Sequence, residues 1–456
     1  MTPDPQTALS SSLREHAAGV VRTLVQAGYE AYWAGGCVRD TIMGRTPKDY
    51  DVATSARPDD VLKLFAKTRE VGKAFGVVQV HAGDFMFDVA TFRRDAGVQD
   101  GRHPERVEFC AAEEDARRRD FTINGLFYDP LRDQVIDFVG GVDDIRRKLV
   151  RSIGSPDERF AEDFLRMLRA VRFASTLQFD LDKPAADAVR RLASNIARIS
   201  PERIQQELTR ILVEAPAAGQ GVRLLQDTGL LPVILPEISA MIGVEQPPEF
   251  HPEGDVFTHT MIMLDAMKER TPELAYAVLF HDVAKPPTFA RTIEPDGRER
   301  IRFTGHDTLG ADMTEQIMKR LRFSNELTEA VKFCVGNHMR FIAVPEMRKS
   351  TLRRLVGAPT FPTELELHRL DCSSSHGDLS NYLLLTQFFE EMKNEPVLPE
   401  PWISGKDVMA LGIPEGREVG RWKKAAYDAQ LEGRFASREE LLPWLEREIS
   451  QSQALT

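Results

Sequence analysis

Apolar and polar positions change their spacing partway along the chain. Up to about residue 150, helical spacing alternates with short runs in which apolar side chains recur every second position. Strands are expected at 31–34, 49–53, 77–81 and 85–92, and helices at 13–27, 38–43 and 58–65. From Pro156 onward strand patterns almost vanish, and helices are expected at 160–175, 185–193 and 202–213. The predicted fold class is therefore α+β, with a mixed sheet and helices followed by all-helical regions.

Breaks in these patterns divide the chain into four predicted regions. Proline-containing stretches at 246–254 and 394–399 interrupt the helical spacing, and the mixed pattern ends near residue 152. The 456 residues are enough for about three domains. The four predicted regions are 1–152, 153–247, 248–394 and a small helical piece at 395–456.

A glycine turn and two aspartates give the first chemical signal. Gly35 and Gly36 end the first predicted strand, and a glycine turn can approach a phosphate closely. Asp49 and Asp51 are two positions apart in a predicted strand, so both carboxylates point to one face. Such a pair suits two Mg²⁺ ions that activate a hydroxyl and clamp a triphosphate. A strand edge with two solvated acids would show the same short pattern.

Asp88 lies in the mostly apolar segment 85–93. A charge inside such a strand is costly unless it is paired or binds a cation. Asp88 is therefore a candidate third carboxylate for the metal pair. A salt bridge to Arg93 is the alternative.

The segment 118–125 places two arginines, an acid, a hydroxyl and an amide close together. Arginines can bind a triphosphate, while Asp120 and Asn124 can hydrogen-bond ribose hydroxyls. The same residues could instead form a helix N-terminus capped by Asp120 or Thr122. The two interpretations are compatible.

A third charged segment lies in the predicted helix at 160–175. Asp163, Arg166, Arg169 and Arg172 recur at intervals of three and so share roughly one helical face. An acceptor and a donor held one turn apart could read the edge of a cytosine or adenine. Intrahelical ion pairs, which are common on helix surfaces, are the alternative.

The third region is rich in histidine. Neutral imidazoles and carboxylates from several helices can converge on one or two divalent cations. A single histidine would more often be a core or surface residue, but the ordered set favours a metal site. The candidate ligands are His259, His281, Asp282, His306, His338 and Asp371.

Composition narrows the class of protein. Hydrophobic residues at 42% and charged residues at 28% fit a globular protein, and no apolar stretch is long enough for a bilayer span. The N-terminus has no pattern of a secretory signal, and the four scattered cysteines predict a reducing, cytoplasmic location. A net charge of −11 argues against indiscriminate coating of nucleic acid, although a local basic surface is still compatible with it.

Six motifs in order carry a family resemblance. They are Gly-Gly-x-Val-Arg-Asp at 35–40, Asp-x-Asp at 49–51, Asp-Val-Ala-Thr-Phe-Arg at 88–93, Arg-Arg-Asp-Phe-Thr-Ile-Asn at 118–124, Arg-Arg-Lys-Leu-Val at 146–150 and Glu-Asp-x-x-Arg-x-x-Arg-Ala-x-Arg-Phe-Ala at 162–174. From about Gly35 to Leu212 the chain resembles the class II CCA-adding tRNA nucleotidyltransferases and the bacterial poly(A) polymerases. The resemblance implies a polymerase-β-like catalytic head at 1–152, a nucleotide-templating and RNA-binding neck at 153–247, a body and a tail.

The resemblance also implies roles for individual residues. Asp49 and Asp51 would hold Mg²⁺, with Asp88 as an accessory acid. In the family the protein itself is the template, which places Asp163 and Arg166 at the base-reading positions. Asp100-Gly101-Arg102-His103-Pro104 resembles a flexible loop associated with switching to ATP, which argues against an enzyme that adds only cytidines. The remaining nucleotide-binding positions are Gly35, Gly36, Arg39, Arg119, Asp120, Asn124, Arg169 and Arg172.

The third region, at 248–394, resembles the HD phosphohydrolase superfamily through its six candidate ligands. The resemblance implies an unidentified divalent metal and hydrolysis of a phosphate ester, such as a cyclic phosphate at a damaged RNA end. An HD module that keeps its ligands but is purely structural is the alternative.

The leading functional hypothesis is CCA addition. The enzyme would transfer CMP and AMP from CTP and ATP to the 3′ end of tRNA, with no membrane partner. A poly(A) polymerase or an A-only adding enzyme of the same family is the nearest alternative. A hypothesis of another class is an HD phosphohydrolase whose polymerase-like half only binds RNA. A non-catalytic tRNA-binding protein is a further alternative, and the three aspartates argue against both.

Overall fold

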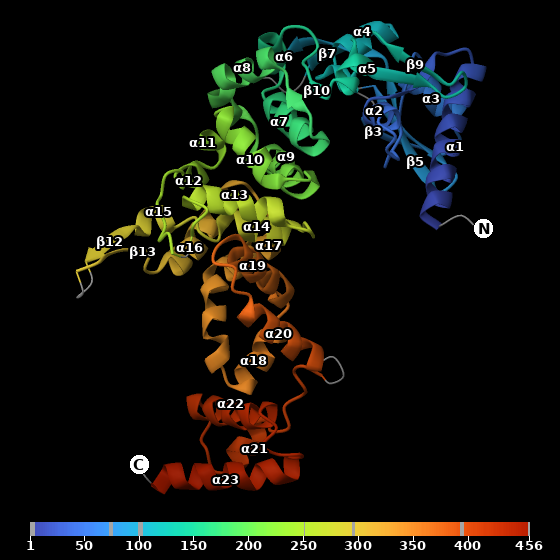
Figure 1. Ribbon diagram of the computed structural model, residues 1–456. Coiled ribbons are helices and arrows are strands. Elements are labelled where there is room, and N and C mark those ends of the chain that lie inside the picture. The colour runs from blue at the N-terminus through green and yellow to red at the C-terminus, as the bar shows by residue number, and fades with distance from the viewer. Residues whose placement is uncertain are drawn as a thin grey trace. The chain divides into compact units, whose positions relative to one another are not determined.

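The computed structural model describes residues 5–72, 76–98, 104–249, 251–293, 297–392 and 396–454. The chain divides into two compact units, residues 1–239 with 320–322 and residues 240–319 with 323–456. Figure 1 labels the elements of both units. The predicted division into four regions is finer than this and stays a prediction.

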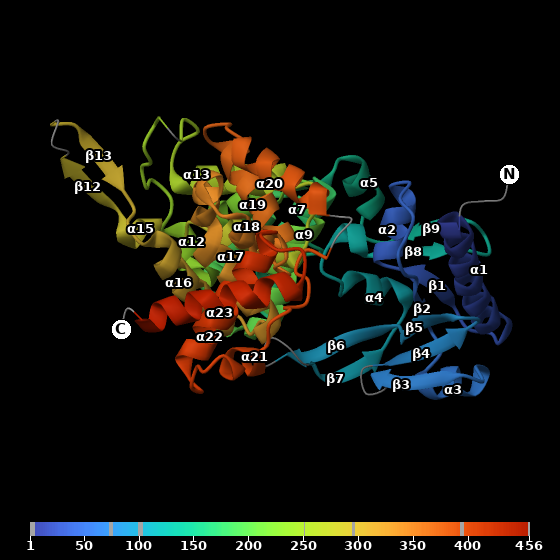
Figure 2. The same cartoon turned by 90° about the horizontal axis from the view of Figure 1, so that it is seen from below.

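A seven-stranded mixed sheet forms the centre of the first unit, in the order β3-β4-β5-β2-β1-β8-β9. Only β2 and β5 are parallel neighbours in this sheet, and the other described pairs are antiparallel. A separate antiparallel pair, β6–β7, extends beyond it (Figure 2). The strands are β1 (Ala31–Ala34), β2 (Asp51–Thr54), β3 (Thr68–Gly72), β4 (Val77–Ala82), β5 (Phe85–Thr91), β6 (Arg93–Val98), β7 (Pro104–Phe109), β8 (Leu126–Asp129) and β9 (Gln134–Asp137).

Helices cover this sheet and then continue alone. Helix α1 contacts β1, β2, β4 and β5, while α2 contacts β1 and β8. The helices around the sheet are α1 (Pro5–Gln26), α2 (Gly36–Ile42), α3 (Pro58–Leu64), α4 (Ala112–Arg117), the 3₁₀ turn η2 (Thr122–Asn124) and α5 (Gly141–Arg146). The helices that follow are α6 (Pro156–Glu162), α7 (Leu165–Leu177), α8 (Lys183–Leu192), η3 (Ala193–Arg198), α9 (Pro201–Glu214), α10 (Ala218–Asp227), α11 (Leu231–Ile234) and α12 (Pro236–Ser239).

The register of the sheet places two predicted metal ligands side by side. Val52 of β2 is the partner of Val89 of β5 in the parallel pair, so Asp51 and Asp88, each one residue earlier, are neighbours. Burial alternates along β5, and in β2 the residues after Asp51 are all buried, so that Val52 and Val89 are buried while both aspartates are exposed. The exposed position of Asp88 corrects the expectation of a charge enclosed in an apolar strand.

The segment before β2 differs slightly from the prediction. The strand begins at Asp51 rather than at Asp49. The alternation nevertheless extends backward, because Asp49 is exposed while Tyr50 is buried with its ring 4.6 Å from that of Trp33. Tyr50 is therefore held in the core, and the two aspartates flank it on the open side.

The predicted continuous helix at 160–175 is wrong. Helix α6 ends at Glu162, Asp163 is extended (φ −154°, ψ 106°), and α7 begins at Leu165. Asp163 Oδ1 accepts a hydrogen bond from the Leu165 amide at 3.0 Å. An aspartate side chain that accepts a hydrogen bond from the backbone N–H two residues later favours the start of a new helix over continuation of the preceding one. Asp163 therefore lies at a junction of two helices.

The second unit is mainly helical and is built around α14 (Pro272–Phe280). Every residue from Leu274 to Phe280 is buried, because the helix is apolar on all sides. Helices α13 (Val256–Ala266), α17 (Asn325–Asn337) and α19 (Phe361–Ser374) pack against it. The unit also contains α15 (Lys285–Thr288), α16 (His306–Arg320), η4 (His338–Glu346), α18 (Lys349–Val356) and α20 (Ser380–Glu391). The sequence changes from apolar to polar directly after α14, where His281 and Asp282 follow the last apolar turn.

Two short strand pairs correct the prediction of purely helical regions. Strands β12 (Ala290–Ile293) and β13 (Glu299–Arg302) form an antiparallel hairpin in the second unit. Strands β10 (Leu149–Val150) and β11 (Asp180–Leu181) pair in the first unit. Each run is short, so the strand pattern in the sequence is weak.

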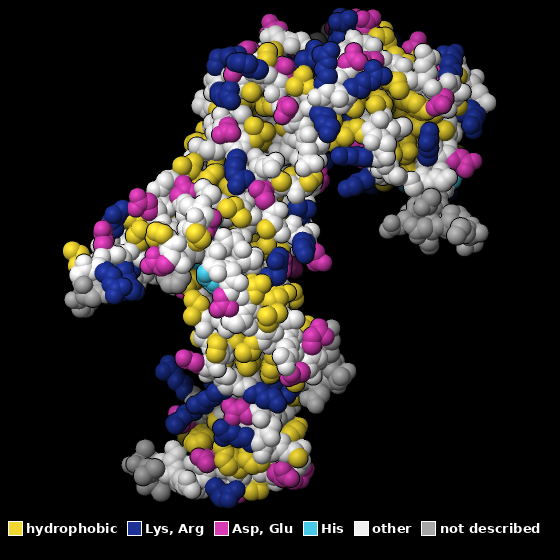
Figure 3. Space-filling view, viewed as in Figure 1, with side chains coloured by type: hydrophobic (Ala, Val, Ile, Leu, Met, Phe, Trp, Pro, Cys, Tyr) yellow, Lys and Arg dark blue, Asp and Glu magenta, His cyan; other side chains and the backbone are white. Residues whose placement is uncertain are grey.

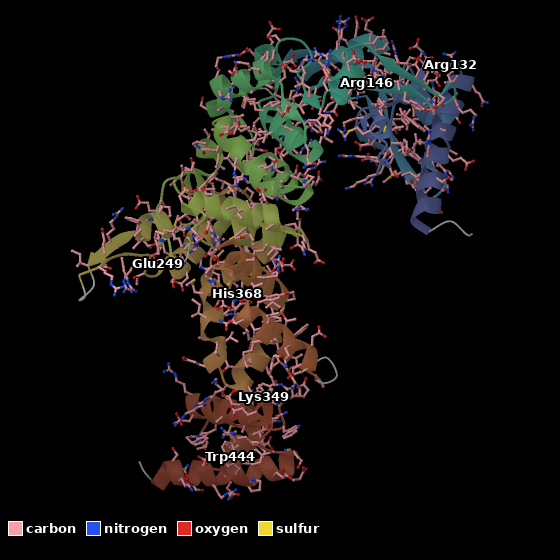
Figure 4. All side chains as sticks on the ribbon, in the orientation of Figure 1. Arg132, Arg146, Glu249, Lys349, His368 and Trp444 are labelled. Atoms are coloured by element: carbon pink, nitrogen blue, oxygen red, sulfur yellow. The ribbon has the colours of Figure 1, made fainter. Side chains whose placement is uncertain are left out.

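The C-terminal helices have a core of their own. Buried side chains from α21 (Gly405–Ala410), α22 (Arg417–Leu431) and α23 (Arg438–Ala454) form it, including Val408, Trp422 and Leu445. Trp444, labelled in Figure 4, packs against Phe435 at the edge of this core, with the ring centroids 5.5 Å apart. The predicted small helical piece at the C-terminus is therefore a packed element.

Two further observations concern the predictions. Residues 100–103 of the candidate ATP-switching loop lie outside the described residues, and Pro104 begins β7. Among the described helices, none combines the length and the apolar character that a bilayer crossing requires.

Two glycine substitutions test the packing beside the sheet. A Cβ on buried Gly141 would lie 2.1 Å from the carbonyl oxygen of Thr122, so Gly141→Ala must displace backbone. We expect the free energy of unfolding to fall by about 1–3 kcal/mol or more. Gly19→Ala in α1 is the matched control, since no atom lies within 4 Å of its Cβ. It should be neutral or stabilising by up to about 1 kcal/mol. Equal losses of unfolding free energy for the two variants, measured by urea denaturation, would contradict this account.

Candidate functional site

Three carboxylates lie together on the open side of the sheet. Reduced hydration of the Asp51 carboxylate, followed by the negative charges of Asp49 and Asp88, raises the pKa of Asp51 to about 6. Arg119 opposes this shift. Asp51 remains exposed as a residue, so the surrounding protein atoms and not full burial reduce its hydration. A concentrated negative field at oxygen ligands is the environment that favours a hard divalent cation.

The glycine turn brings arginines to the same place. Gly35 has φ +74°, and a Cβ there would lie 3.1 Å from Arg119 Nη1. Glycine therefore permits both the turn and the close approach of a guanidinium. On the next helix, Arg39 Nη1 donates to Asn124 Oδ1 at 2.8 Å, and the Cβ position of Gly36 is 3.7 Å from Arg39 Nη2. The predicted triphosphate residues thus surround one turn.

A continuous chain of polar contacts leads from this turn into the helices. Asn124 Nδ2 donates to Asp120 Oδ1 at 3.2 Å, and Arg169 of α7 donates to Asp120 Oδ2 at 2.8 Å. Burial would raise the pKa of Asp120, but the Arg169 guanidinium and its hydrogen bond hold it below the ordinary value. Asp120 is only 8% exposed, so it is a charged group held by partners in the protein. The alternative of a helix cap does not describe Asp120, which bonds side chains across elements.

Glu207 of α9 is the last residue in this series of polar contacts, and it was not among the predicted residues. It lies 2.5 Å from Arg172 Nε and 3.7 Å from Arg169 Nη1. Arg172 is 3% exposed, so its guanidinium is occupied by Glu207 and packs 4.0 Å from the Phe173 ring centroid. The predicted nucleotide contact of Arg172 stays a prediction. Glu207 was missed because nothing in α9 alone shows which helix it faces.

The two predicted base-reading residues, Asp163 and Arg166, form hydrogen bonds with other residues and not with each other. Arg166 Nη1 lies 2.5 Å from Glu162 Oε2 and donates to the Arg159 carbonyl at 2.9 Å. Asp163 is bonded to Arg203 of α9, with Nη2 and Oδ2 2.6 Å apart. The helix break at Asp163 explains this, because it removes the carboxylate from the face that carries Arg166. Arg203 is a second residue that sequence reasoning did not select.

The six predicted metal ligands of the second unit come together from separate elements. They come from α13, from the end of α14, from the start of α16, from the junction of α17 and η4, and from α19. They form two groups whose ligand atoms all lie within 4.8 Å of one another: His259 with His281 and Asp371, and Asp282 with His306 and His338. In the part of the chain that the structure describes, the head carboxylates form no group this tight.

Three histidines are oriented in the same way. Nδ1 of each lies 2.6–2.8 Å from the backbone carbonyl three residues earlier: His281 with Val278, His306 with Phe303, and His338 with Val335. Since Nδ1 is the donor to the carbonyl, the lone pair of each neutral ring is on Nε2. The Nε2 atoms of His306 and His338 are 3.2 Å apart, and Nε2 of His281 is 3.1 Å from Asp282 Oδ2. Burial, with the neighbouring His281, lowers the pKa of His338 to about 4, which keeps it neutral.

His259 lies between two carboxylates, one of them unpredicted. Nε2 is 3.1 Å from Asp371 Oδ1, and Nδ1 is 2.6 Å from Glu253 Oε1. Burial would lower the pKa of His259, but these acids raise it to about 9. Glu253 also lies 2.9 Å from His251 Nδ1, and these three residues form a further group of possible ligands. The nearby spacing of His251, Glu253 and His259 was the available signal.

Not every histidine of this unit belongs to the groups. His368 of α19, labelled in Figure 4, packs edge-on against Phe341 with the ring centroids 5.1 Å apart. It is a core histidine, the common case for a single one. The clustered rings are likewise buried, and little histidine is visible on the face shown in Figure 3. On that face, cationic and anionic side chains are interspersed.

Comparison with known proteins shows which family this chain belongs to. Three family models match it: "Poly A polymerase head domain" over residues 31–151, "Probable RNA and SrmB- binding site of polymerase A" over 178–242 and "HD domain" over 255–369. A CC-adding tRNA nucleotidyltransferase of Thermus thermophilus is 34% identical over 426 residues, which is 91% of this chain and 93% of that protein. The chain belongs to the tRNA nucleotidyltransferase and poly(A) polymerase family.

Other members of the family match in part or in fold. The CCA-adding enzyme of Geobacillus kaustophilus is 45% identical over 230 residues, 50% of this chain and 56% of that enzyme. The chain thus spans about half the length of several curated relatives that it matches. A Bacillus stearothermophilus CCA-adding enzyme crystallised with CTP has a TM-score of 0.73 and 27% identity, covering 97% of this chain and 99% of that one. The family resemblance and the α+β fold class predicted from the sequence are confirmed.

Substitution of Glu207 tests how much this series of polar contacts contributes to stability. Glu207→Ala leaves the buried Arg172 guanidinium without its partner, and we expect the free energy of unfolding to fall by about 3–5 kcal/mol. Glu214→Ala on the same helix is the control. It removes the partner of Arg210 at an exposed pair and should cost about 1 kcal/mol or less. Chemical denaturation measures both, and similar small losses would show that Arg172 is satisfied without Glu207.

Proposed function

We propose that this protein is a CCA-adding tRNA nucleotidyltransferase, which transfers CMP and AMP from CTP and ATP to the 3′ end of tRNA. The observation that carries the proposal is the crowding of Asp49, Asp51 and Asp88 beside the Gly35 turn and Arg119. The family relationship and the relatives named CCA-adding enzymes support this reaction, and the relative named for CC addition supports the transfer of cytidines to tRNA.

The three carboxylates fit Mg²⁺. Reduced hydration, followed by the charges of Asp49 and Asp88, raises the pKa of Asp51, and a divalent cation between the three carboxylates would relieve their repulsion. When bound, such cations lower the pKa of the attacking 3′ hydroxyl and offset the charge of the triphosphate. Asp49 and Asp51 would be the ligands, with Asp88 as the accessory acid.

The remaining residues bind and orient the nucleotide. The backbone at Gly35 and Gly36 allows close approach of phosphate, and Arg39 and Arg119 supply cationic donors beside it. Asp120 and Asn124 would hydrogen-bond the ribose, while Arg169 holds Asp120 in place. Asp163 and Arg166 would read the base, with the protein as template.

The proposal is tested with three tRNA substrates that lack CCA, carry only its first C, or carry both Cs. CTP and ATP are supplied separately and together. Two cytidines followed by one adenosine is the expected product. Arrest after two cytidines with both nucleotides present would instead match the Thermus thermophilus relative, and a long adenosine tail would indicate a poly(A) polymerase.

Substitution of one head carboxylate should stop nucleotide addition. Asp49→Ala removes a cation ligand, and we expect a loss of roughly a thousandfold or more in the rate. Asp143→Ala is the matched control, because Asp143 is exposed on the same domain and paired with Arg146, which is labelled in Figure 4. Nucleotide incorporation measures both variants, and substantial activity in Asp49→Ala would contradict the metal assignment.

A second activity is supported by the second unit. We propose that the HD region hydrolyses a phosphate ester, such as a 2′,3′-cyclic phosphate at an RNA end. The buried Nε2 of His281 carries a lone pair and faces the acceptor oxygen Asp282 Oδ2 at 3.1 Å, so among the described residues it makes no hydrogen bond there. Mixed imidazole and carboxylate ligands suit transition-metal cations. When bound, such a cation supplies a nucleophile at neutral pH. Lys285, 2.7 Å from Asp282, offsets the buried negative charge.

The two proposed sites can be separated by one substitution. His338→Gln keeps a donor for the Val335 carbonyl but removes a metal ligand, so bound metal and phosphate release should both fall about tenfold or more. Nucleotide addition should be unchanged. His376→Ala, at an exposed histidine of the same unit, is the control. Normal metal content in His338→Gln would contradict the assignment.

The proposed substrate and the cysteines indicate the cellular compartment in which the protein acts. All four cysteines are described and none forms a disulfide. With tRNA as substrate, we propose that the protein acts in the cytoplasm.

A further inference from the structure

Arg203 of α9 holds the carboxylate that the proposed function assigns to base reading. Its Nη2 is 2.6 Å from Asp163 Oδ2 and its Nη1 is 3.3 Å from Asp163 Oδ1. The two side chains are 24% and 22% exposed, so the pair is partly shielded but open to a ligand. The residues are 40 positions apart in sequence and meet through the packing of helices.

The carboxylate is fixed by donors from two directions. Besides both Arg203 nitrogens, the Leu165 amide donates to Asp163 Oδ1 at 3.0 Å. Each carboxylate oxygen accepts about two hydrogen bonds. Oδ1 is therefore fully used, and Oδ2 retains about one acceptor position. Since Asp163 lies outside both helices, these donors are what set its orientation.

Arg203 is itself held by its helix. Ile204, Leu208 and Ile211 bury one side of α9, and Glu207, one turn beyond Arg203, binds Arg172 and Arg169 of α7. Arg203 and Glu207 are four residues apart and so lie on neighbouring positions of one face. This face therefore presents a cation to Asp163 and an anion to the arginines of α7.

One free acceptor position distinguishes the bases by chemistry. Cytosine at C4 and adenine at C6 carry an exocyclic amino group, which donates, whereas uracil at C4 and guanine at C6 carry a carbonyl oxygen there, which accepts. A carboxylate oxygen can bond the former and repels the latter. We propose that Arg203 is a specificity-determining positioning residue, which orients Asp163 so that the site accepts bases with an amino group at pyrimidine C4 or purine C6 and rejects bases with a carbonyl oxygen there. The inference rests on the proposed role of Asp163.

A purely structural role makes a different prediction. An ion pair that only joins α9 to the junction of α6 and α7 would alter stability, and by little, because both side chains are partly solvated. It would leave the ratio of CTP to UTP use unchanged. Selection between these two nucleotides is therefore the informative measurement.

The experiment uses the full-length protein and a tRNA that lacks CCA. The variants are Arg203→Ala, Arg203→Lys and the control Arg191→Ala. The control breaks the exposed ion pair in which Arg191 donates to both carboxylate oxygens of Asp157. The kcat/KM and the dissociation constant are measured for CTP and for UTP, with melting curves to verify folding. We expect Arg203→Ala to reduce the preference for CTP about tenfold. Arg203→Lys should restore part of it, and Arg191→Ala should not change it.

A second background shows whether Arg203 acts through Asp163. In Asp163→Ala, the further change Arg203→Ala should have no additional effect on selection. An unchanged CTP preference in folded Arg203→Ala, or additive effects of the two changes, would overturn the inference. Equal binding of CTP and UTP by the wild type would also overturn it, even if nucleotides are added. A wild type that binds CTP over UTP but adds neither would instead contradict the proposed function.

Discussion

The buried ion pair between Asp120 and Arg169 is the constraint on which the first unit depends. Asp120 is nearly enclosed, and a carboxylate in such a place is tolerated only when partners compensate its charge. Arg169 of α7 provides that compensation at 2.6 Å, and Asn124 completes it from the same segment as Asp120. Because Asn124 also binds Arg39, the glycine turn and the helices share one polar framework. The groups proposed for phosphate and ribose binding are therefore held in a common frame.

The second unit uses backbone carbonyls for the same purpose. His281, His306 and His338 each direct Nδ1 to a carbonyl three residues earlier, which orients Nε2 toward the neighbouring ligands. These ligands are buried and closely grouped before any cation is considered. The head carboxylates are exposed and more widely spaced, and reduced hydration together with the charges of Asp49 and Asp88 raises the pKa of Asp51. One site is thus preorganised by hydrogen bonds, while the other depends on countercharge.

Much of the architecture was predictable because the signals are local. The alternation around Asp51 and Asp88, the glycine turn at Gly35 and the apolar run before His281 each depend on neighbours in sequence. The ordered histidines and aspartates of the second unit were chosen as ligands, and they converge. The helix at 160–175 was predicted without its break, because apolar spacing continues through Asp163 while the side-chain hydrogen bond that ends the helix leaves no trace in periodicity.

The sequence by itself determined the order of the motifs, the α+β class and the residue types available for chemistry, since these follow from local pattern and composition. Only the tertiary structure decided which charges meet. Spacing at intervals of three allows Asp163 to face Arg166, yet Asp163 is bonded to Arg203, and Arg172 to Glu207. Those partners are 40 and 35 residues away, and their helix faces come into contact only when apolar surfaces pack.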